Sequence, residues 1–331
     1  MRKLIALVLA VAMMLVVAGC GGADEKKADG DKQIKMGFSQ IGAESEWRTA
    51  NTESVKQAAK DAGIDLQFSD AQQKQENQIK AIRSFIAQGV DIIAFVPIVE
   101  TGWDTVLKEA KDAKIPVIIV DRDLKVEDDS LYVAKIGTNM ETEGQKAFEW
   151  LNKYVTDNNV KPHEGDKLNL VILEGTVGST AALGRTKGFG DGLAANADKY
   201  NVLASQTGEF TRQKGQEVME SFLKSYGNKI DILFAHNDDM ALGAIQAIEA
   251  AGMKPGKDII ILSIDGVKGI FQAMIEGKAN CTVECNPLQG PLLMETAKKV
   301  LAGEKVDKVV YVEEGVFPAD VAEKVMPERK Y

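Results

Sequence analysis

Short apolar runs alternate with amphipathic helical segments from Ile34 onward, and this alternation is the strongest constraint on the fold. Apolar residues recur at helical spacing over Thr52–Ala62 and Gln75–Gln88, which predicts one buried face for each helix. A repeated strand–helix–strand order predicts an α/β protein whose parallel sheets are covered by helices on both faces. The predicted strands are Ile34–Ser39, Leu66–Ser69, Ile92–Val96, Val117–Val120, Tyr132–Gly137, Leu168–Leu173, Val202–Gln206, Ile232–Ala235, Ile259–Ile264 and Cys281–Glu284.

These strands are too many for one doubly wound sheet, which commonly has about five or six. The length of 331 residues also allows two domains, at roughly 150 residues for each. We therefore expect two Rossmann-like lobes, each built on its own parallel sheet. The first change of lobe is predicted near Gly137-Thr138-Asn139, where the strand Tyr132–Gly137 ends.

The N-terminus has the pattern of an export signal. Residues 1–3 are Met-Arg-Lys, and the apolar run of fourteen residues that follows is too short to span a bilayer comfortably. Val17-Ala18-Gly19-Cys20 then looks like a bacterial lipobox, which predicts that residues 1–19 are removed and that Cys20 carries lipid. An ordinary signal peptide with a coincidental cysteine is the alternative. Residues 20–33 are predicted to be a flexible tether, because Gly21–Gln33 has no apolar residue larger than alanine.

The composition excludes several classes of protein. Forty basic and 49 acidic residues give a net charge of −9, which argues against nucleic-acid binding. Two histidines and three cysteines argue against a His-rich metal centre and a disulfide-stapled mini-protein. Four residues apart on one strand, Cys281 and Cys285 would lie about 13 Å apart, too far for a disulfide. We expect both to be small buried hydrophobes.

Catalytic motifs are weak. The segment Gly178–Arg185 has five residues between its glycines and is followed by threonine, so it departs from the phosphate-binding loop pattern. His163 and His236 have no nucleophile at a convincing position. A pair of carboxylates could serve a glycosidase, but the sequence does not give their separation. We expect no enzyme activity, no cofactor and no metal.

Polar residues follow nearly every predicted strand. In parallel α/β sheets, ligands bind beyond the carboxyl ends of the strands. Any one of these residues could equally be a helix cap, but together they indicate a cleft between two lobes. The strand-end residues are Ser39, Gln40, Asp70, Asp121, Arg122, Glu174, Asn237, Asp238, Asp239, Asp265 and Glu284.

Aromatic and arginine side chains in polar surroundings suggest the kind of ligand. Trp47-Arg48 opens a helix inside the polar stretch GAESEWRTAN, and Phe210 is a lone aromatic in another polar loop. An indole suits the C–H face of a sugar, and a guanidinium suits its oxygens. Asp121-Arg122 could be a surface ion pair or a clamp that accepts from and donates to hydroxyls. The mixture is typical of a polyol site.

Several stretches resemble a known family: GFSQIGAESEWR (37–48), QQKQENQIKAIRSFIAQGVD (72–91), TGW and LKEAKDA (within 101–113), IPV and DR (within 115–122), EGTVGS (174–179), GEFTRQKGQEVMESF (208–222), AHNDDMALGAIQAI (235–248) and SIDGV (263–267). They are similar to type I periplasmic sugar-binding proteins of ABC transporters, in the ribose/galactose group. The QQKQENQIKA and WR elements resemble the narrower galactofuranose branch. The resemblance covers the chain from about Met36 to Pro287.

The resemblance implies roles for individual residues. Trp47 and Arg48 would be wall and donor of the first lobe, and Asp121 with Arg122 its clamp. The second-lobe contacts would be Arg185, Phe210, Asn237 and Asp265, and Glu284 would lie at a hinge crossing where relatives often carry glutamine. Two features depart from the galactofuranose pattern: Glu174 stands where that pattern has glutamine, and the lipobox contrasts with a protein free in the periplasm. Both leave the exact sugar open.

These observations predict a binding protein without chemistry of its own. We expect lobes of residues 34–137 plus 285–310 and 138–284 plus 311–331, with hinge crossings near Thr138, Glu284 and Tyr311. A monosaccharide would bind between the lobes of a monomer, close the hinge, and pass to an ABC permease. A sugar or autoinducer sensor for a receptor kinase is the main alternative. A hydrolase is a second alternative. A transcriptional repressor is a third, but it would begin with a basic helix-turn-helix of about 50–60 residues, whereas this sequence begins with the export signal and an acidic tether.

Overall fold

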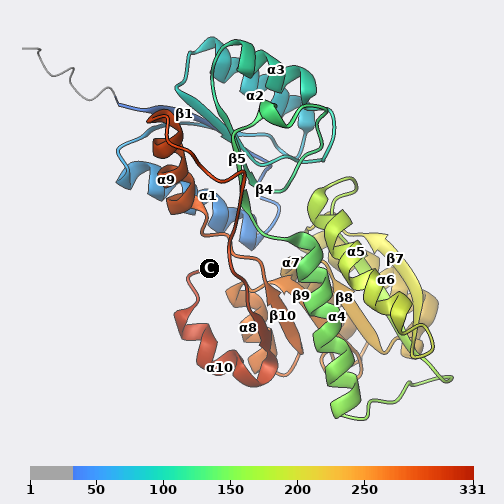
Figure 1. Ribbon diagram of the computed structural model, residues 1–331. Coiled ribbons are helices and arrows are strands. Elements are labelled where there is room, and N and C mark those ends of the chain that lie inside the picture. Colours follow the sequence, from blue (N-terminus) through green and yellow to red (C-terminus); the bar gives the residue numbers. More distant parts are fainter. Residues whose placement is uncertain (1–32) are drawn as a thin grey trace, which may run out of the picture. The chain divides into compact units, whose positions relative to one another are not determined.

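The computed structural model describes residues 33–331 (Figure 1). The predicted signal peptide, the lipidation site Cys20 and all of the predicted tether except Gln33 lie outside these residues. Among the helices of residues 33–331, none is long and apolar enough to cross a membrane.

Two six-stranded sheets form the framework of residues 33–331, as predicted. In spatial order, the first contains β11 (Val309–Tyr311), β5 (Ala134–Gly137), β4 (Val117–Asp121), β3 (Ile92–Phe95), β1 (Lys35–Gln40) and β2 (Asp65–Asp70). The second contains β12 (Val316–Pro318), β10 (Cys281–Glu284), β9 (Ile260–Asp265), β8 (Ile232–Ala235), β6 (Leu168–Glu174) and β7 (Tyr200–Thr207). Neighbouring strands run parallel, except that β12 is antiparallel to β10.

Helices pack on both sheets and complete two α/β lobes. The first lobe contains α1 (Glu46–Asp61), α2 (Gln75–Ala87), α3 (Asp104–Asp112) and α9 (Gly290–Leu301). The second contains α4 (Met140–Asp157), α5 (Thr180–Ala195), α6 (Arg212–Tyr226), α7 (Asp238–Ala250), α8 (Lys268–Ile275) and α10 (Ala322–Val325). Short 3-10 turns occur at Asp129–Leu131, Gly227–Lys229, Ala319–Val321 and Met326–Glu328.

The sequence pattern located every strand of the alternating region, within a few residues at each end. β11 and β12 were not predicted. Each has only three residues, and neither contains a buried one, so no apolar run marks them. By contrast, β3, β4, β8 and β9 are buried along their whole length, which is the pattern of strands covered on both faces.

Within residues 33–331 the chain passes between the sheets three times, which is the predicted three-segment hinge. The crossings run from β5 to α4, from β10 to α9, and from β11 to β12. The predicted lobe bounds assign Tyr311 to the second lobe, whereas Tyr311 pairs with Gly137 in the first sheet. The third crossing therefore begins after Tyr311.

Several helices begin with a polar cap at the strand ends that face the other lobe. Ser45 accepts from the amide of Arg48 at the start of α1, and Asn139 accepts from Thr142 at the start of α4. Ser179, Thr211 and Asn237 cap α5, α6 and α7 in the same way. Each cap satisfies an amide that the helix itself leaves unbonded, and this fixes where the helix starts.

Candidate functional site

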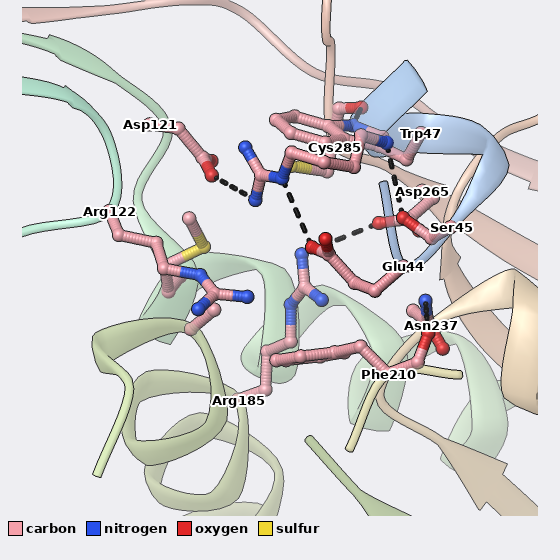
Figure 2. Close-up of a pocket in the computed structure, with 13 residues that line it drawn as sticks. Glu44, Ser45, Trp47, Asp121, Arg122, Arg185, Phe210, Asn237, Asp265 and Cys285 are labelled. Carbon is pink, nitrogen blue, oxygen red and sulfur yellow. Dashed lines mark hydrogen bonds and ion pairs between the residues drawn. The ribbon is translucent and has the colours of Figure 1, made fainter. Parts of the chain in front are cut away.

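A small cavity lies between the carboxyl edges of the two sheets (Figure 2). Of the ten predicted contact residues, eight line this cavity. The lining residues are Glu44, Ser45, Trp47, Arg48, Asp121, Arg122, Met140, Ala181, Arg185, Phe210, Asn237, Asp265 and Cys285.

Arg48 is the centre of a buried ion network on the first lobe. Its Nε atom lies 3.1 Å from Glu44 Oε1 and its Nη2 atom 2.8 Å from Asp121 Oδ2. The side chains of all three residues are only 3% exposed. Burial opposes the charge on Arg48, but Asp121 and Glu44 more than offset it, so the pKa of Arg48 is raised. The network therefore holds a charged donor rigidly at the cavity wall.

Arg122 is held differently, because no carboxylate of residues 33–331 forms an ion pair with it. Its Nη1 atom donates to the carbonyl of Ile98 at 3.1 Å, and its guanidinium lies 5.0 Å from the centroid of the Phe210 ring. Burial, together with the nearby charge of Arg48, lowers the pKa of Arg122 to about 10. Arg122 thus remains a cation at neutral pH in a site where its charge is poorly compensated.

Arg185 provides the corresponding donor on the second lobe, from α5. Its Nε atom lies 2.7 Å from Glu143 Oε2, and its Nη1 atom donates to the carbonyl of His236 at 2.5 Å. Nη2 lies 3.6 Å from Asp265 Oδ1. Although burial disfavours its charge, Glu143 and Asp265 raise the pKa of Arg185. Figure 2 shows Arg122 and Arg185 directing their guanidinium groups toward the same space.

Two aromatic side chains form apolar walls of the cavity. The indole Nε1 of Trp47 donates to the carbonyl of Cys285 at 2.5 Å, which fixes the ring against the second hinge crossing. Phe210 projects over Gly175, where a Cβ atom would lie 1.9 Å from the Phe210 ring. The Phe210 ring can occupy this position only because residue 175 is a glycine and has no Cβ atom.

The backbone adopts the left-handed region at three lining residues that are not glycine. The φ angles are 62° at Asp121, 62° at Phe210 and 135° at Asp265. Such angles are uncommon for residues with a Cβ atom and are concentrated at binding and catalytic sites. Asp121 and Asp265 are the last residues of β4 and β9, and Phe210 lies in the loop before α6.

Three polar atoms of lining residues have no protein partner within residues 33–331. They are Glu44 Oε2, Arg48 Nη1 and Arg122 Nε, and all three are buried. A buried polar atom without a hydrogen bond costs roughly 1–3 kcal/mol, and more when the group is charged. The cavity thus offers one acceptor and two charged donors, which a ligand with several hydroxyl groups would satisfy.

The lobes are in direct contact on two sides of this cavity. On one side the amide of Glu100 donates to the carbonyl of Gly178 at 2.9 Å, and the amide of Asp123 donates to Thr180 Oγ1 at 2.8 Å. These bonds join the loops after β3 and β4 to the loop before α5 and to the first residue of that helix.

On the other side α1 meets α7. The amide of Glu46 donates to Asp239 Oδ2 at 2.7 Å, and Arg212 bridges the carboxylates of Glu46 and Asp239. Hydrogen bonds and ion pairs thus join the two lobes on both sides of the cavity.

Two predicted residues do not line the cavity as described for residues 33–331: Ser39 and Glu284. Ser39 is fully buried inside β1. Glu284 Oε1 accepts from Arg329 Nη1 at 2.6 Å and from the Tyr331 hydroxyl at 2.9 Å. Position at a strand end placed Glu284 near the cleft, but its side chain turns to the C-terminal segment instead.

Asn237 is both a helix cap and a residue of the cavity wall, the two roles considered for a polar residue at a strand end. It lines the cavity, yet its Oδ1 atom caps α7 by accepting from Met240, and its Nδ2 atom donates to the carbonyl of Phe210 at 3.1 Å. Asn237 therefore fixes the positive-φ loop that carries Phe210. Its direct bonds are to protein.

The lining residues that the sequence analysis missed are Glu44, Ser45, Met140, Ala181 and Cys285. Glu44 and Ser45 precede α1 by one or two positions, so a search of residues directly after strands passes over them. Cys285 follows β10 and was interpreted as a buried hydrophobe. Both Cys281 and Cys285 are buried, and neither forms a disulfide within residues 33–331.

Comparison with known proteins identifies the family. The family described as "Periplasmic binding protein domain" matches residues 36–305, which is most of the chain. This chain is a periplasmic binding protein. It belongs to the type I sugar-binding proteins of ABC transporters, as its sequence motifs predicted.

Individual relatives of this periplasmic binding protein are similar over nearly their whole length. The galactofuranose-binding protein YtfQ of Escherichia coli is 46% identical over 300 residues, which are 90% of this chain and 92% of YtfQ. A solved structure from Mycobacterium smegmatis in complex with β-D-fucofuranose has 50% identity and a TM-score of 0.85, covering 90% of this chain and 95% of that one.

A third relative is the binding protein of the arabinose ABC transporter from Shewanella sp. ANA-3, solved with α- and β-L-arabinofuranose. It has 49% identity and a TM-score of 0.84, covering 90% of this chain and 96% of that one. These relatives are transport proteins and not enzymes. As a periplasmic binding protein, the chain therefore acts outside the cytoplasm by binding rather than by catalysis.

Proposed function

We propose that this periplasmic binding protein captures a monosaccharide in its furanose form, similar to galactofuranose, and delivers it to an ABC permease. The observation that carries this proposal is the set of unpartnered polar atoms Glu44 Oε2, Arg48 Nη1 and Arg122 Nε, which are buried beside the cavity within residues 33–331. A sugar presents several hydroxyl groups in a small volume, and each can donate as well as accept.

The polar and the aromatic side chains of the cavity would recognise different parts of the sugar. Glu44 accepts from one hydroxyl, while Arg48 and Arg122 donate to the oxygens of others. The rings of Trp47 and Phe210 cover the C–H faces of the sugar, which are apolar. Because Arg48 is fixed by two carboxylates, its donors are already oriented before the sugar arrives, and little ordering cost remains.

The furanose preference rests on the relatives. One similar protein is a galactofuranose-binding protein, and two others were solved with bound fucofuranose and arabinofuranose. A five-membered ring with an exocyclic diol is flatter and longer than a pyranose. A site shaped for it would leave buried donors unpaired when it held a six-membered ring, and such mismatches cost far more than a lost methylene.

Transport requires that the lobes open and close. We propose that the lobes 34–137 plus 285–311 and 138–284 plus 312–331, with the third crossing placed after Tyr311, move as bodies about the three crossings. The sugar joins both walls and so favours the closed arrangement, which a permease then recognises on a monomeric binding protein.

The decisive measurement is the ring form of the bound sugar. Galactose labelled with ¹³C is equilibrated with the protein, and NMR of the bound fraction distinguishes furanose from pyranose at the anomeric carbon. We expect furanose signals only. A bound pyranose, or tight binding of glucose or ribose with no response to galactose, would overturn the specificity.

A matched pair of variants locates the binding. Arg122→Gln removes a cavity donor, whereas Arg83→Gln changes an exposed arginine that pairs with Glu109 on the surface. We expect titration calorimetry to show at least about a tenfold loss of affinity for Arg122→Gln, because hydrogen bonds to charged groups contribute roughly 1.5–3 kcal/mol. Arg83→Gln should bind as the wild type does. Equal affinities in the two variants would place the sugar elsewhere.

We also propose that Cys20 anchors the protein to the extracytoplasmic face of the membrane. The support is the lipobox Val17-Ala18-Gly19-Cys20 and the absence of a membrane-spanning helix from residues 33–331. Cys20→Ala should then move the protein from the membrane pellet to the soluble fraction. A variant that stays in the pellet would contradict the anchor and leave the proposal on sugar binding intact.

A further inference from the structure

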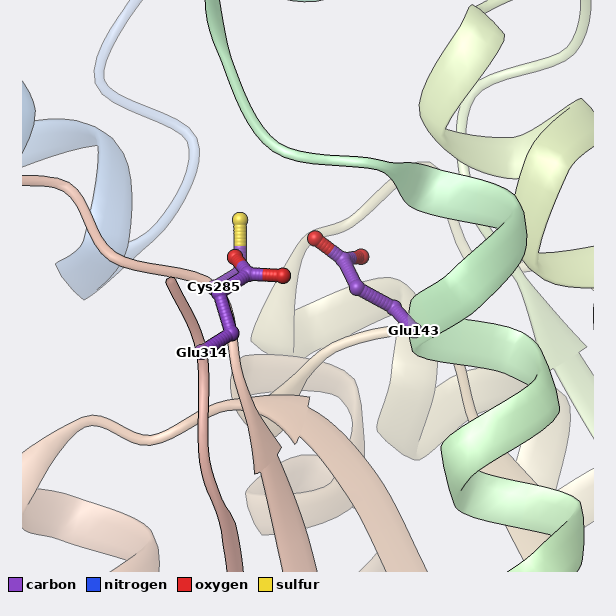
Figure 3. A group of neighbouring side chains, drawn as sticks. All are labelled: Glu143, Cys285 and Glu314. Carbon is purple, nitrogen blue, oxygen red and sulfur yellow. The ribbon is translucent and has the colours of Figure 1, made fainter. Parts of the chain in front are cut away.

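The hinge brings three metal-ligating side chains together, each from a different crossing. Glu143 lies in the first turn of α4, just after the first crossing. Cys285 follows β10 in the second crossing, and Glu314 lies between β11 and β12 in the third. One ligand atom from each residue lies within 4.8 Å of the others (Figure 3). Residues far apart in the sequence thus form one compact cluster.

Glu143 has a free carboxylate oxygen inside this cluster. Its Oε2 atom is bonded to Arg185 Nε, but Oε1 has no hydrogen-bond partner within residues 33–331, and the residue is 0% exposed. Figure 3 shows the Glu143 carboxylate directed toward Cys285 and Glu314. A buried carboxylate oxygen of this kind needs a positive or proton-donating partner, because its desolvation is otherwise uncompensated.

The three groups do not satisfy one another. No hydrogen bond within residues 33–331 joins the Glu143 carboxylate, the Cys285 thiol and the Glu314 carboxylate. Glu314 Oε1 accepts only from the amide of Asn286, at 3.3 Å. This differs from a pair of carboxyl groups that share a proton, which would be in direct contact. The arrangement is instead that of ligands around a common point.

Nearby cations compensate only part of the charge. Arg185 pairs with Glu143, as described above. Lys146 approaches Glu314, but its Nζ atom donates to the backbone carbonyl of that residue at 2.8 Å. Within residues 33–331 the Glu314 carboxylate has no ion-pair partner. A positive charge at the centre of the cluster would therefore be favourable.

We propose that Glu143, Cys285 and Glu314 form a binding site for a divalent cation with the chemistry of zinc. Thiolate and carboxylate are both ligands of Zn²⁺, whereas Mg²⁺ and Ca²⁺ select oxygen ligands alone. Burial, together with the charge of Glu143, raises the pKa of Glu314 to about 11. On binding, the Cys285 thiol and the Glu314 carboxyl each lose a proton to solvent, and the sulfur and two carboxylate oxygens coordinate the ion. Ligand distances of about 2.0–2.3 Å would draw the three side chains closer together than they now lie.

Such an ion would join all three hinge crossings through one centre. It would also act on the sugar cavity, because Cys285 lines that cavity and Glu143 holds Arg185, which lines it too. This site is distinct from sugar capture and does not depend on the identity of the sugar.

Cobalt provides a direct test on the full chain. Co²⁺ is titrated into metal-free protein, and a thiolate-to-cobalt charge-transfer band in the near ultraviolet reports a Cys–metal bond. We expect the band in the wild type and in Cys281→Ser, which changes the other buried cysteine of the described chain. Cys285→Ser should remove it. A wild type without the band, or a band that persists in Cys285→Ser, would overturn the site.

Zinc affinity tests the carboxylates. Calorimetry should show one Zn²⁺ bound by the wild type and by Glu313→Gln, which changes the exposed neighbour of Glu314. Glu314→Gln should bind Zn²⁺ more than tenfold more weakly, since even the loss of an outer partner of a metal ligand costs about 10–100-fold. Zinc should also raise the Tm of the wild type and of Glu313→Gln. Equal zinc affinity in Glu314→Gln and Glu313→Gln would contradict the proposal.

Discussion

Asp121→Asn is the sharpest perturbation of the proposed sugar site. Within residues 33–331 the Asp121 carboxylate makes one side-chain hydrogen bond, from Arg48 Nη2 to Oδ2 at 2.8 Å, and it is 3% exposed. Asparagine keeps the shape and one acceptor but removes the charge. It also tolerates the φ of 62° at this position, whereas alanine would add strain of about 1–2 kcal/mol.

The expected loss follows from the bond that changes. A hydrogen bond to a charged group contributes about 1.5–3 kcal/mol, and every 1.4 kcal/mol is a factor of ten in Kd. Sugar affinity should therefore fall by about 10- to 150-fold, because Arg48 loses one of its two anchors and the sugar loses an anionic acceptor. The Tm should also fall, because the change removes one of the two carboxylates that compensate the buried charge of Arg48.

Titration calorimetry measures this loss, and thermal unfolding checks the fold. Asp70→Asn is the matched control. Asp70 ends β2, the edge strand of the same sheet, is exposed, and bonds only the nearby amide of Gln72 through its side chain within residues 33–331. This variant should bind sugar normally. A loss of less than threefold in Asp121→Asn that is folded at the assay temperature would refute the assigned role.

Three further outcomes are expected. Gly175→Ala should reduce sugar affinity more than tenfold, measured by calorimetry, because the new Cβ would lie 1.9 Å from the Phe210 ring and must displace it from the wall; normal binding would show that the ring is dispensable. Thr180→Val removes the hydroxyl that accepts from the Asp123 amide across the two lobes. The loss of this hydrogen bond should destabilise the closed arrangement by about 0.5–1.5 kcal/mol and lower the sugar affinity about two- to tenfold. Small-angle scattering should show more open protein at subsaturating sugar. His236→Gln tests a pH dependence. Burial, together with the charge of Arg185, lowers the pKa of His236 to about 3. The neutral imidazole therefore stabilises the folded state above pH 6.5, and this contribution is lost as the pH falls toward 3. Urea unfolding should show the stability difference between wild type and variant shrinking over that range, and a constant difference would contradict the assignment.

Much of the architecture could be predicted because parallel strands covered on both faces are apolar along their whole length. Strands such as β4 and β8 are visible as uninterrupted apolar runs. β11 and β12 carry no such signal, because edge strands of three residues owe their pairing to neighbours that the local sequence does not describe.

The site was predictable only where the chain direction fixes the position of a side chain. Asp121 and Asp265 end their strands, so the topology alone brings them to the cleft. Glu44 belongs to a loop whose path depends on tertiary contacts with Arg48. Glu284 also ends a strand, but its direction is set by Arg329, forty-five positions later in the chain. Pairings of that kind are decided by the fold as a whole.

The threefold passage of the chain between the sheets also determines the order in which the protein can mature during synthesis. The first sheet begins with β1 yet lacks its edge strand β11 until residue 311 has emerged. Before α9 is made, the apolar face of α1 around Val55 has no cover from Leu293 and Ala297. A nascent chain that ends anywhere before α9 therefore exposes surface in the lobe that was translated first. The first lobe is complete only with β11 and the second only with β12 and α10, so the last tenth of the chain decides when each becomes native.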